Sequence, residues 1–302
     1  MTLAALASGG KPALAAALAQ LERAPADEST LALLDAAYAA PRAQVVGVTG
    51  PPGVGKSTLL GALIALWRRE GQTVGVIAVD PSSRRSGGAL LGDRTRLRTD
   101  PGDSGVFVRS MAARDKLGGL AALTHSAMVL MRALFDRVVI ETVGVGQSET
   151  DVAGAADTVV LCVQPGSGDS LQFMKAGIVE IPHVVVVTKS DLGDAAERAR
   201  HDAIAVLSLA DRGGWQVPVL TLSALRQLGI EALAAAVAAH WRWLAEGDRL
   251  ATARAAQAAQ WLVDDLREAL GRDGLRRAGP PALVPGESPF RALARIAAGL
   301  RG

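Results

Sequence analysis

Nine residues in the first third of the chain have the types and the spacing of a phosphate-binding loop. They read G-x-x-x-x-G-K-S-T and directly follow a mostly apolar run at residues 44–49. Glycines let successive backbone N–H groups turn toward phosphate oxygens, and the helix that starts here adds its positive dipole. The lysine ammonium reaches the β- and γ-phosphates, and the next hydroxyl ligates Mg²⁺. The candidate nucleotide-binding residues are Gly50, Pro51, Pro52, Gly53, Val54, Gly55, Lys56, Ser57 and Thr58.

Acidic residues follow two further apolar runs, and an acid at the end of a strand can position Mg²⁺ and its water. Asp80 follows residues 73–79, and Glu141 follows residues 137–140. Acids in this position also cap the next helix, so the phosphate loop is what favours the metal interpretation. We interpret Asp80 and Glu141, together with the Ser57 hydroxyl, as metal ligands.

Two glycine-rich stretches near these acids are too polar for core elements and predict switch loops. Residues 86–94 contain Asp93, which we interpret as a third acid near the metal. Residues 144–150 begin with Gly144, whose N–H we expect to face the γ-phosphate. The predicted catalytic residues are Lys56, Asp80, Asp93 and Glu141, and the three acids are predicted metal ligands as well.

A third pattern concerns the base. Thr188, Lys189 and Asp191 follow the apolar run at residues 184–187 and resemble the N-K-x-D guanine motif, with Thr in place of Asn. A carboxylate accepts hydrogen bonds from N1–H and the 2-amino group of guanine, whereas adenine leaves it unpaired. The stem of Lys189 can lie along the base. A second loop fits the S-A-x element that contacts the guanine O6, at Ser223, Ala224 and Leu225.

The elements that must position these residues alternate between short apolar runs and amphipathic helices. Runs this apolar suit strands that helices cover on both faces, which predicts an α/β fold with a mostly parallel, doubly wound sheet. We expect strands at residues 44–49, 73–79, 106–108, 138–140, 158–163, 184–187 and 217–220. We expect helices before and after this region, at residues 11–23, 30–39, 248–270 and 290–300.

These boundaries predict three parts: a helical N-terminal extension at residues 1–42, a nucleotide-binding domain at 43–246 and a helical C-terminal arm at 247–302. Among 302 residues the formal charge is only +2 and aromatic residues make up 3%. A base-stacking surface needs exposed rings, and a membrane span needs about 20 apolar residues in a row. We therefore expect neither nucleic acid nor membrane as a partner. The single cysteine, Cys162, indicates a reducing, cytoplasmic location.

Several motifs taken together resemble the MeaB/ArgK family, the GTPases associated with adenosylcobalamin-dependent methylmalonyl-CoA mutase. They are AVDPSS at residues 78–83, SGG at 86–88, LGDRTR at 91–96, ETVGVGQSE at 141–149 and TKSD at 188–191. The resemblance covers about residues 42 to 245. It implies a P-loop NTPase fold of the SIMIBI type and a protein that binds GTP and GDP with Mg²⁺. It also implies hydrolysis of GTP to GDP and phosphate.

The resemblance further implies a chaperone that gates adenosylcobalamin loading into the mutase and protects that enzyme. Such a protein acts as a homodimer through its helical extensions, and an adenosyltransferase is a further candidate partner. Ser170 and Phe173 depart from the family's usual G-D-E-L-Q-G pattern, which leaves a related acyl-CoA mutase open as the partner. The residues expected to respond to the partner are Gln147, Glu149, Asp169, Gln172 and Lys175.

Three other functions share parts of this pattern. A metal-insertion GTPase has the same fold, but such proteins usually display Cys/His clusters, whereas here the four histidines are scattered and Cys162 lies in an apolar run. A P-loop kinase has no reason to carry a guanine-reading Asp191. A scaffold with a degenerate nucleotide site is disfavoured because the phosphate loop and its acids are intact. Trp241, Trp243 and Trp261 fit either a partner face or the core.

Overall fold

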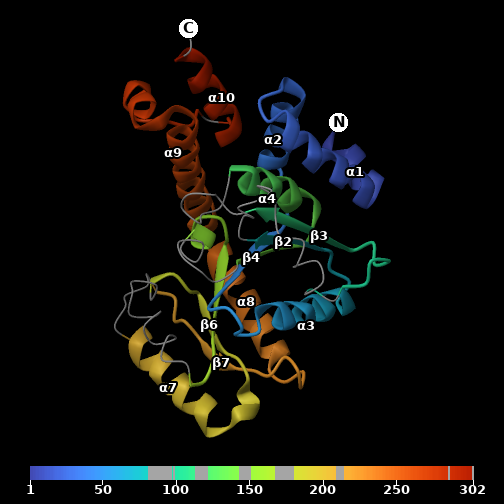
Figure 1. Ribbon diagram of the computed structural model, residues 1–302, viewed down its shortest axis with the longest axis vertical. Helices are drawn as coiled ribbons and strands as arrows, with labels where there is room; N and C mark the ends of the chain where they lie inside the picture. The colour runs from blue at the N-terminus through green and yellow to red at the C-terminus, as the bar shows by residue number, and fades with distance from the viewer. Residues whose placement is uncertain are drawn as a thin grey trace, which may run out of the picture.

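Seven strands in the described part of the chain form one parallel sheet, which confirms the predicted α/β fold class (Figure 1). The computed structural model describes residues 1–80, 97, 99–112, 122–142, 151–166, 180–208, 214–284 and 286–300. The strand order is β3-β2-β4-β1-β5-β6-β7, and every pairing is parallel. The strands are β1 (Gln44–Thr49), β2 (Val74–Asp80), β3 (Val106–Ala112), β4 (Arg137–Thr142), β5 (Thr158–Val163), β6 (Val184–Val187) and β7 (Val219–Thr221).

Helices cover both faces of this sheet, which explains why its central strands are apolar throughout. Every residue of β1, β5 and β6 is buried. Val45 belongs to the core on the α4 face, whereas Val46 and Val48 belong to the core on the α3 and α8 face. Figure 1 shows α3 and α4 on opposite sides of the strands. The helices of the sheet region are α3 (Lys56–Arg69), α4 (Ala122–Leu134), α7 (Asp194–Leu207) and α8 (Ile230–Ala245), with the short 3₁₀ helices η2 (Val152–Gly154) and η4 (Ser190–Leu192).

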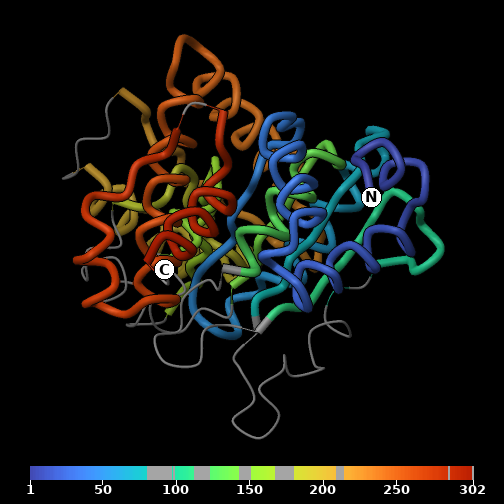
Figure 2. The backbone as a smooth tube through the Cα atoms, turned by 90° about the horizontal axis from the view of Figure 1, so that it is seen from above, coloured from blue at the N-terminus to red at the C-terminus, as the bar shows by residue number. Residues whose placement is uncertain are grey.

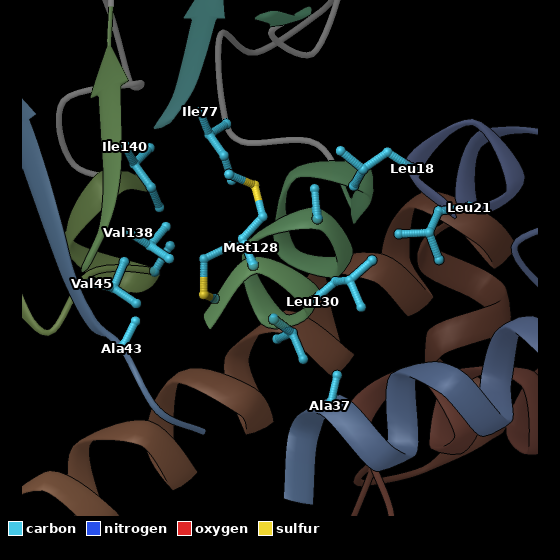
Figure 3. Close-up of a cluster of buried hydrophobic side chains, with 14 of the residues drawn as sticks. Leu18, Leu21, Ala37, Ala43, Val45, Ile77, Met128, Leu130, Val138 and Ile140 are labelled. Carbon is cyan, nitrogen blue, oxygen red and sulfur yellow. The ribbon is translucent and has the colours of Figure 1, made fainter. Parts of the chain in front are cut away.

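The first and last helices pack together around α4. They are α1 (Leu3–Arg23), α2 (Glu28–Ala39), α9 (Arg249–Ala278) and α10 (Pro289–Gly299). Figure 3 shows Leu18 and Leu21 of α1 near Leu130 of α4, while Ile77 and Val138 of the sheet point toward Met128. Figure 2 shows these terminal helices from above. In the described residues no helix is long and apolar enough to cross a membrane.

An ionic contact fastens α10 to α2. Arg291 forms two hydrogen bonds to Glu28, at 2.8 and 3.1 Å, and also pairs with Asp35. The hydroxyl of Ser288 caps the first turn of α10 and donates to Asp35 at 2.5 Å. Phe290 of the same turn is buried in the core around α4, so α10 packs against this core and against α2.

The predicted strands are present, and the differences at their ends have local causes. The first strand, β1, was predicted with its observed bounds. We expected a strand at residues 217–220, but Pro218 has no N–H to donate to a ladder, so β7 begins at Val219. Residues 109–112 carry few β-branched side chains, yet β3 extends through them because it pairs with β2 along seven positions.

The N- and C-terminal helices differ from the predicted ones in length. The first helix was predicted to begin at residue 11, after Gly9 and Gly10, and the structure continues it back to Leu3 across a kink at Gly10. The helix predicted at residues 248–270 continues to Ala278 across a similar kink at Gly271. In both places a glycine with positive φ lets two helical segments join at an angle.

Two histidines that are far apart in the sequence meet beside the first residues of β5 and β6. His240 of α8 is fully buried, and its ring stacks on His183 with ring centroids 4.2 Å apart. Trp215 and Trp243 pack against the same imidazole, and the Thr158 hydroxyl lies 2.8 Å from its Nδ1. Burial, with His183 nearby, lowers the pKa of His240 to about 3. The four histidines are scattered in the sequence, and the contact between these two was not predicted.

This lowered pKa predicts a loss of stability in acid. The unfolded chain binds a proton at His240 near pH 6.5, whereas the folded chain does so only near pH 3. The free energy of unfolding should therefore fall by up to about 1.4 kcal/mol per pH unit as the pH drops below 6.5. Urea unfolding at several pH values measures this slope.

The matched pair of variants is His240→Asn and His201→Asn, because His201 is exposed. We expect His240→Asn to flatten the slope between pH 6.5 and 4, and His201→Asn to keep it. An unchanged slope in His240→Asn contradicts the prediction.

Candidate nucleotide site

The loop at residues 50–58 lies at the carboxyl end of β1, in the middle of the sheet. The chain places β4 on one side of β1 and β5 on the other, so the order of winding reverses here. In open α/β sheets ligands bind in the crevice at this switch point, because the flanking loops diverge. The sheet therefore puts the predicted phosphate loop where such folds hold their ligands.

Glycine is required at the first position of this loop. Gly50 has φ +136°, and a Cβ added to it would lie 2.2 Å from the carbonyl oxygen of Cys162 on β5. The loop therefore packs its backbone directly on the neighbouring strand. Gly55 has φ +102° and precedes the first residue of α3, so the chain turns into the helix through a left-handed residue.

Lys56 is the first residue of α3, and its side chain turns back under the loop. Its Nζ donates to the carbonyl oxygens of Gly50, at 2.7 Å, and Pro51, at 3.1 Å. Only 7% of Lys56 is exposed. Lys56 begins α3, and the N-terminus of a helix favours an anion through its dipole and its free N–H groups.

Two oxygen groups meet beside the loop. The Ser57 hydroxyl donates to Glu141 Oε1 at 2.7 Å, and Glu141 is buried in β4. The backbone of Asp80 ends β2, which pairs with β4 so that Ala78 lies opposite Glu141. A hydroxyl and a carboxylate are the hard oxygen ligands that Mg²⁺ takes in proteins. Ser57 and Glu141 therefore fit this ion.

The predicted base motif is joined to the phosphate loop by a side chain. The hydroxyl of Thr188, at the end of β6, donates to the carbonyl oxygens of Val54, at 2.8 Å, and Val163, at 3.1 Å. Thr188 is buried. The Thr that replaces the usual Asn of the motif thus ties the loop after β6 to the loop after β1 and to the end of β5.

Asp191 lies on η4, and the structure brings it to the predicted second loop. The Ser223 hydroxyl donates to Asp191 Oδ1 at 2.6 Å, and this hydrogen bond is the main cause that lowers the pKa of Asp191. The Asp191 side chain is exposed, so one carboxylate oxygen is held while the group faces solvent. Next to Ser223, Ala224 is partly buried and Leu225 is 85% exposed.

Comparisons with known proteins give the family. The sequence profile described as "Methylmalonyl Co-A mutase-associated GTPase MeaB" matches residues 13–275. The chain belongs to the MeaB family. The GTPase ArgK of Escherichia coli is 40% identical to it over 229 residues, which cover 74% of this chain and 69% of ArgK. A protein of Caulobacter vibrioides is 39% identical over 289 residues, which cover 93% of this chain and 88% of that protein.

A solved structure also matches along nearly the whole length. The structure described as an LAO/AO transport system kinase has a TM-score of 0.71 and 31% sequence identity, and the match covers 99% of this chain and 96% of that one. Together these likenesses identify this MeaB-family protein as a P-loop GTPase that binds guanine nucleotide and hydrolyses GTP.

One contact in this GTPase was not expected from the sequence. Lys189 adopts a left-handed backbone conformation with φ +56°, and its Nζ donates to Gln164 Oε1 at 2.5 Å. Gln164 belongs to no recognisable motif. Its only signal in the sequence is its position one residue after the apolar run of β5, at the edge where the other candidate residues gather.

Cys162 and Trp261, whose roles the sequence left open, lie in the core of the MeaB-family chain. Burial raises the pKa of the Cys162 thiol to about 12, so the thiol stays protonated at neutral pH. Trp261 is also buried, on the α4 side of the sheet.

Seven predicted residues lie outside the described residues: Asp93, Gly144, Gln147, Glu149, Asp169, Gln172 and Lys175.

The Thr188 bridge predicts an effect on stability. Thr188→Val keeps the shape of the side chain but removes the donor that two carbonyls share, so the free energy of unfolding should fall by about 1–3 kcal/mol. Denaturant unfolding of the purified protein measures the change. Thr188→Ser keeps the hydroxyl and should retain most of the stability; equal losses in both variants would argue against the bridge.

Proposed function

We propose that this GTPase is a chaperone that gates adenosylcobalamin loading into a B12-dependent acyl-CoA mutase and protects that enzyme. The mutase is methylmalonyl-CoA mutase or a related acyl-CoA mutase. The family profile, described as mutase-associated, supports the partner. The observation that carries the nucleotide half is the Ser57 to Glu141 hydrogen bond beside the buried Lys56, because it joins the phosphate loop to an acid of another strand.

In the proposed site, Ser57, Asp80, Asp93 and Glu141 hold Mg²⁺, which when bound neutralises charge on the phosphate oxygens. Lys56 and the backbone N–H groups of residues 53–58 stabilise the charge that develops as water attacks the γ-phosphate. Lys56 is suited to this because α3 fixes its position and the loop carbonyls already orient its ammonium. Gly144 adds an N–H toward the γ-phosphate.

The base is read at the other end of the crevice. Asp191 accepts from N1–H and the 2-amino group of guanine, and Ser223 fixes the carboxylate for this role. Because the pKa of Asp191 lies below its usual value, the group stays ionised well into the acid range. Thr188 and Lys189 support the base, and the loop of Ser223, Ala224 and Leu225 completes the pocket.

Asp191→Asn should shift base preference from GTP toward xanthosine triphosphate. The amide presents an N–H donor where xanthine carries a carbonyl in place of the 2-amino group. Loss of the carboxylate leaves the N1–H and the 2-amino group of guanine without their acceptor, which costs on the order of 1–3 kcal/mol. The Kd for GTP should therefore rise about tenfold or more. Competition binding of the two nucleotides measures the ratio.

Asp194→Asn is the matched control, because Asp194 is an exposed acid at the start of α7. It should leave the ratio unchanged. A ratio in Asp191→Asn equal to that of Asp194→Asn would reject Asp191 as the guanine reader.

The proposed partner role involves a set of switch residues and the division of the chain into three parts. Gln147, Glu149, Asp169, Gln172 and Lys175 form the surface that responds to the mutase. Residues 247–302 form the arm of a cytoplasmic homodimer, residues 43–246 the GTPase domain and residues 1–42 the N-terminal extension. An adenosyltransferase is the proposed source of adenosylcobalamin.

The proposal is tested with the purified GTPase, adenosylcobalamin and cobalamin-free methylmalonyl-CoA mutase. We expect the mutase to accelerate phosphate release from GTP. A non-hydrolysable GTP analogue should block cobalamin transfer, which is measured by the absorption of the cobalamin. Lys56→Ala should lower GTP turnover about 10²-fold or more, the usual cost of losing one group that stabilises transition-state charge.

The two halves of the proposal fail separately. Unchanged turnover in Lys56→Ala would overturn the phosphate site. Normal turnover that responds to neither methylmalonyl-CoA mutase nor any other B12-dependent acyl-CoA mutase tested would overturn the chaperone role and leave the GTPase site intact.

A further inference from the structure

Two side chains of α9 hold the backbone of η2, more than a hundred residues earlier in the chain. Gln257 Nε2 donates to the carbonyl oxygens of Ala153, at 3.2 Å, and Ala156, at 2.9 Å. Trp261 Nε1 donates to the carbonyl oxygen of Gly154 at 2.7 Å. The last carbonyls of a helix have no partner within it, so they need donors from elsewhere. Here a helix of the C-terminal arm supplies them.

The Trp261 part of this contact is buried, and the Gln257 part is partly buried. Trp261 is only 2% exposed, and its ring stacks on His125 of α4 with ring centroids 4.7 Å apart. In such surroundings a hydrogen bond is stronger than in water, and losing it leaves a carbonyl unsatisfied. The hold of α9 on η2 is therefore both specific and costly to break.

The segment that α9 holds lies directly against β1. A Cβ added to Gly47 would lie 2.5 Å from Val152 Cγ2 and 3.0 Å from Ala156 Cβ, so η2 packs on the bare backbone of the strand. Gly47 is three positions before Gly50, where the phosphate loop begins. A shift of η2 is thus passed to the strand that carries the loop.

A second link joins the same helix to the same strand. Arg254 of α9 forms two hydrogen bonds to Asp157, each 2.8 Å, and a third to the carbonyl oxygen of Ala43 at 2.9 Å. Asp157 in turn accepts from the backbone N–H of Val45 at 2.7 Å. Successive turns of α9 therefore contact the start of β1 through Arg254 and its middle through η2.

We infer that Gln257 and Trp261 are positioning residues for GTP hydrolysis, which act through η2 and β1 on the phosphate loop. The inference rests on the proposed phosphate site at residues 50–58. Small displacements of groups that orient the reacting phosphate slow the chemical step. A loop that is arranged differently in the GDP and GTP states would, through the same contacts, change how firmly α9 is held in the two states. The C-terminal arm is thereby connected to the state of the nucleotide.

Gln257 is held through its Nε2 alone. Its Oε1 is buried, and no residue in the described part of the chain donates to it. The two hydrogen bonds from Nε2 are therefore the polar contacts that a substitution of Gln257 removes.

The test uses the full-length protein and three variants. Trp261→Phe keeps the ring and removes the N–H, and Gln257→Leu keeps the size and removes both donors. Gln260→Leu is the matched control, because Gln260 is an exposed residue of α9 that donates to Asp264 of the same helix. We expect kcat for GTP to fall about fivefold in the first two variants, the effect of about one hydrogen bond. The Kd for GDP should stay within twofold.

A fall in kcat with an unchanged Kd for GDP distinguishes a positioning role from a role in stability alone. If Trp261→Phe and Gln257→Leu lower the melting temperature but keep the kcat of Gln260→Leu, the role is structural and the inference is wrong. Hydrogen exchange gives the reciprocal measurement. Exchange at residues 254–261 should differ between the GDP state and a GTP-analogue state in the unmodified protein, and identical exchange would overturn the coupling.

The inference and the site on which it rests fail in different ways. GTP turnover that survives Lys56→Ala shows that the phosphate site itself is misplaced. Turnover that is lost in Lys56→Ala but unaffected in Trp261→Phe and Gln257→Leu leaves the site standing and removes only the role of α9.

Discussion

The position of β1 between β4 and β5 is the constraint on which the rest of the molecule depends. The strand is buried on both faces, and directly after its carboxyl end Gly50 packs on the carbonyl of Cys162. Parallel pairing then brings the ends of β4, β5 and β6 to the same edge. As a result Glu141 reaches Ser57 and Thr188 reaches Val54, although each pair is far apart in the sequence.

The same strand explains why the terminal helices share a core with the sheet. One face of β1 packs on the core around α4, which also contains residues of α1, α2, α9 and α10. Within that core Arg132 is buried, and burial together with nearby Arg254 lowers its pKa to about 10. Two guanidinium groups thus share the neighbourhood of one carboxylate, Asp157. Of the two, Arg254 forms a largely buried ion pair with Asp157, with Nη2 and Oδ2 2.8 Å apart.

Sequence patterns were sufficient wherever one local signal decides the structure. Glycines before a lysine and a serine predicted the phosphate loop, and unbroken apolar runs predicted β1, β5 and β6 with their observed bounds. The patterns failed where a distant partner decides. The pairing with β2 extends β3, the stacking of His183 on His240 needs α8 beside β6, and Gln164 meets Lys189 only because β5 and β6 are neighbours. None of these contacts leaves a periodic trace in the chain.

The Thr188 bridge shows how few bonds connect the two ends of the crevice. Its hydroxyl has one proton, which the carbonyls of Val54 and Val163 share. β5 is held more strongly, because the Thr188 N–H also donates to Val163 and Lys189 donates to Gln164. On the far side of β1, the segment 152–157 is held from α9 by donors that act on separate carbonyls and on Asp157. The base side thus contacts the loop at residues 50–58 directly, through Val54, whereas α9 contacts the segment beside β1. Any effect of α9 on the loop must therefore pass through the packing of Val152 and Ala156 on Gly47.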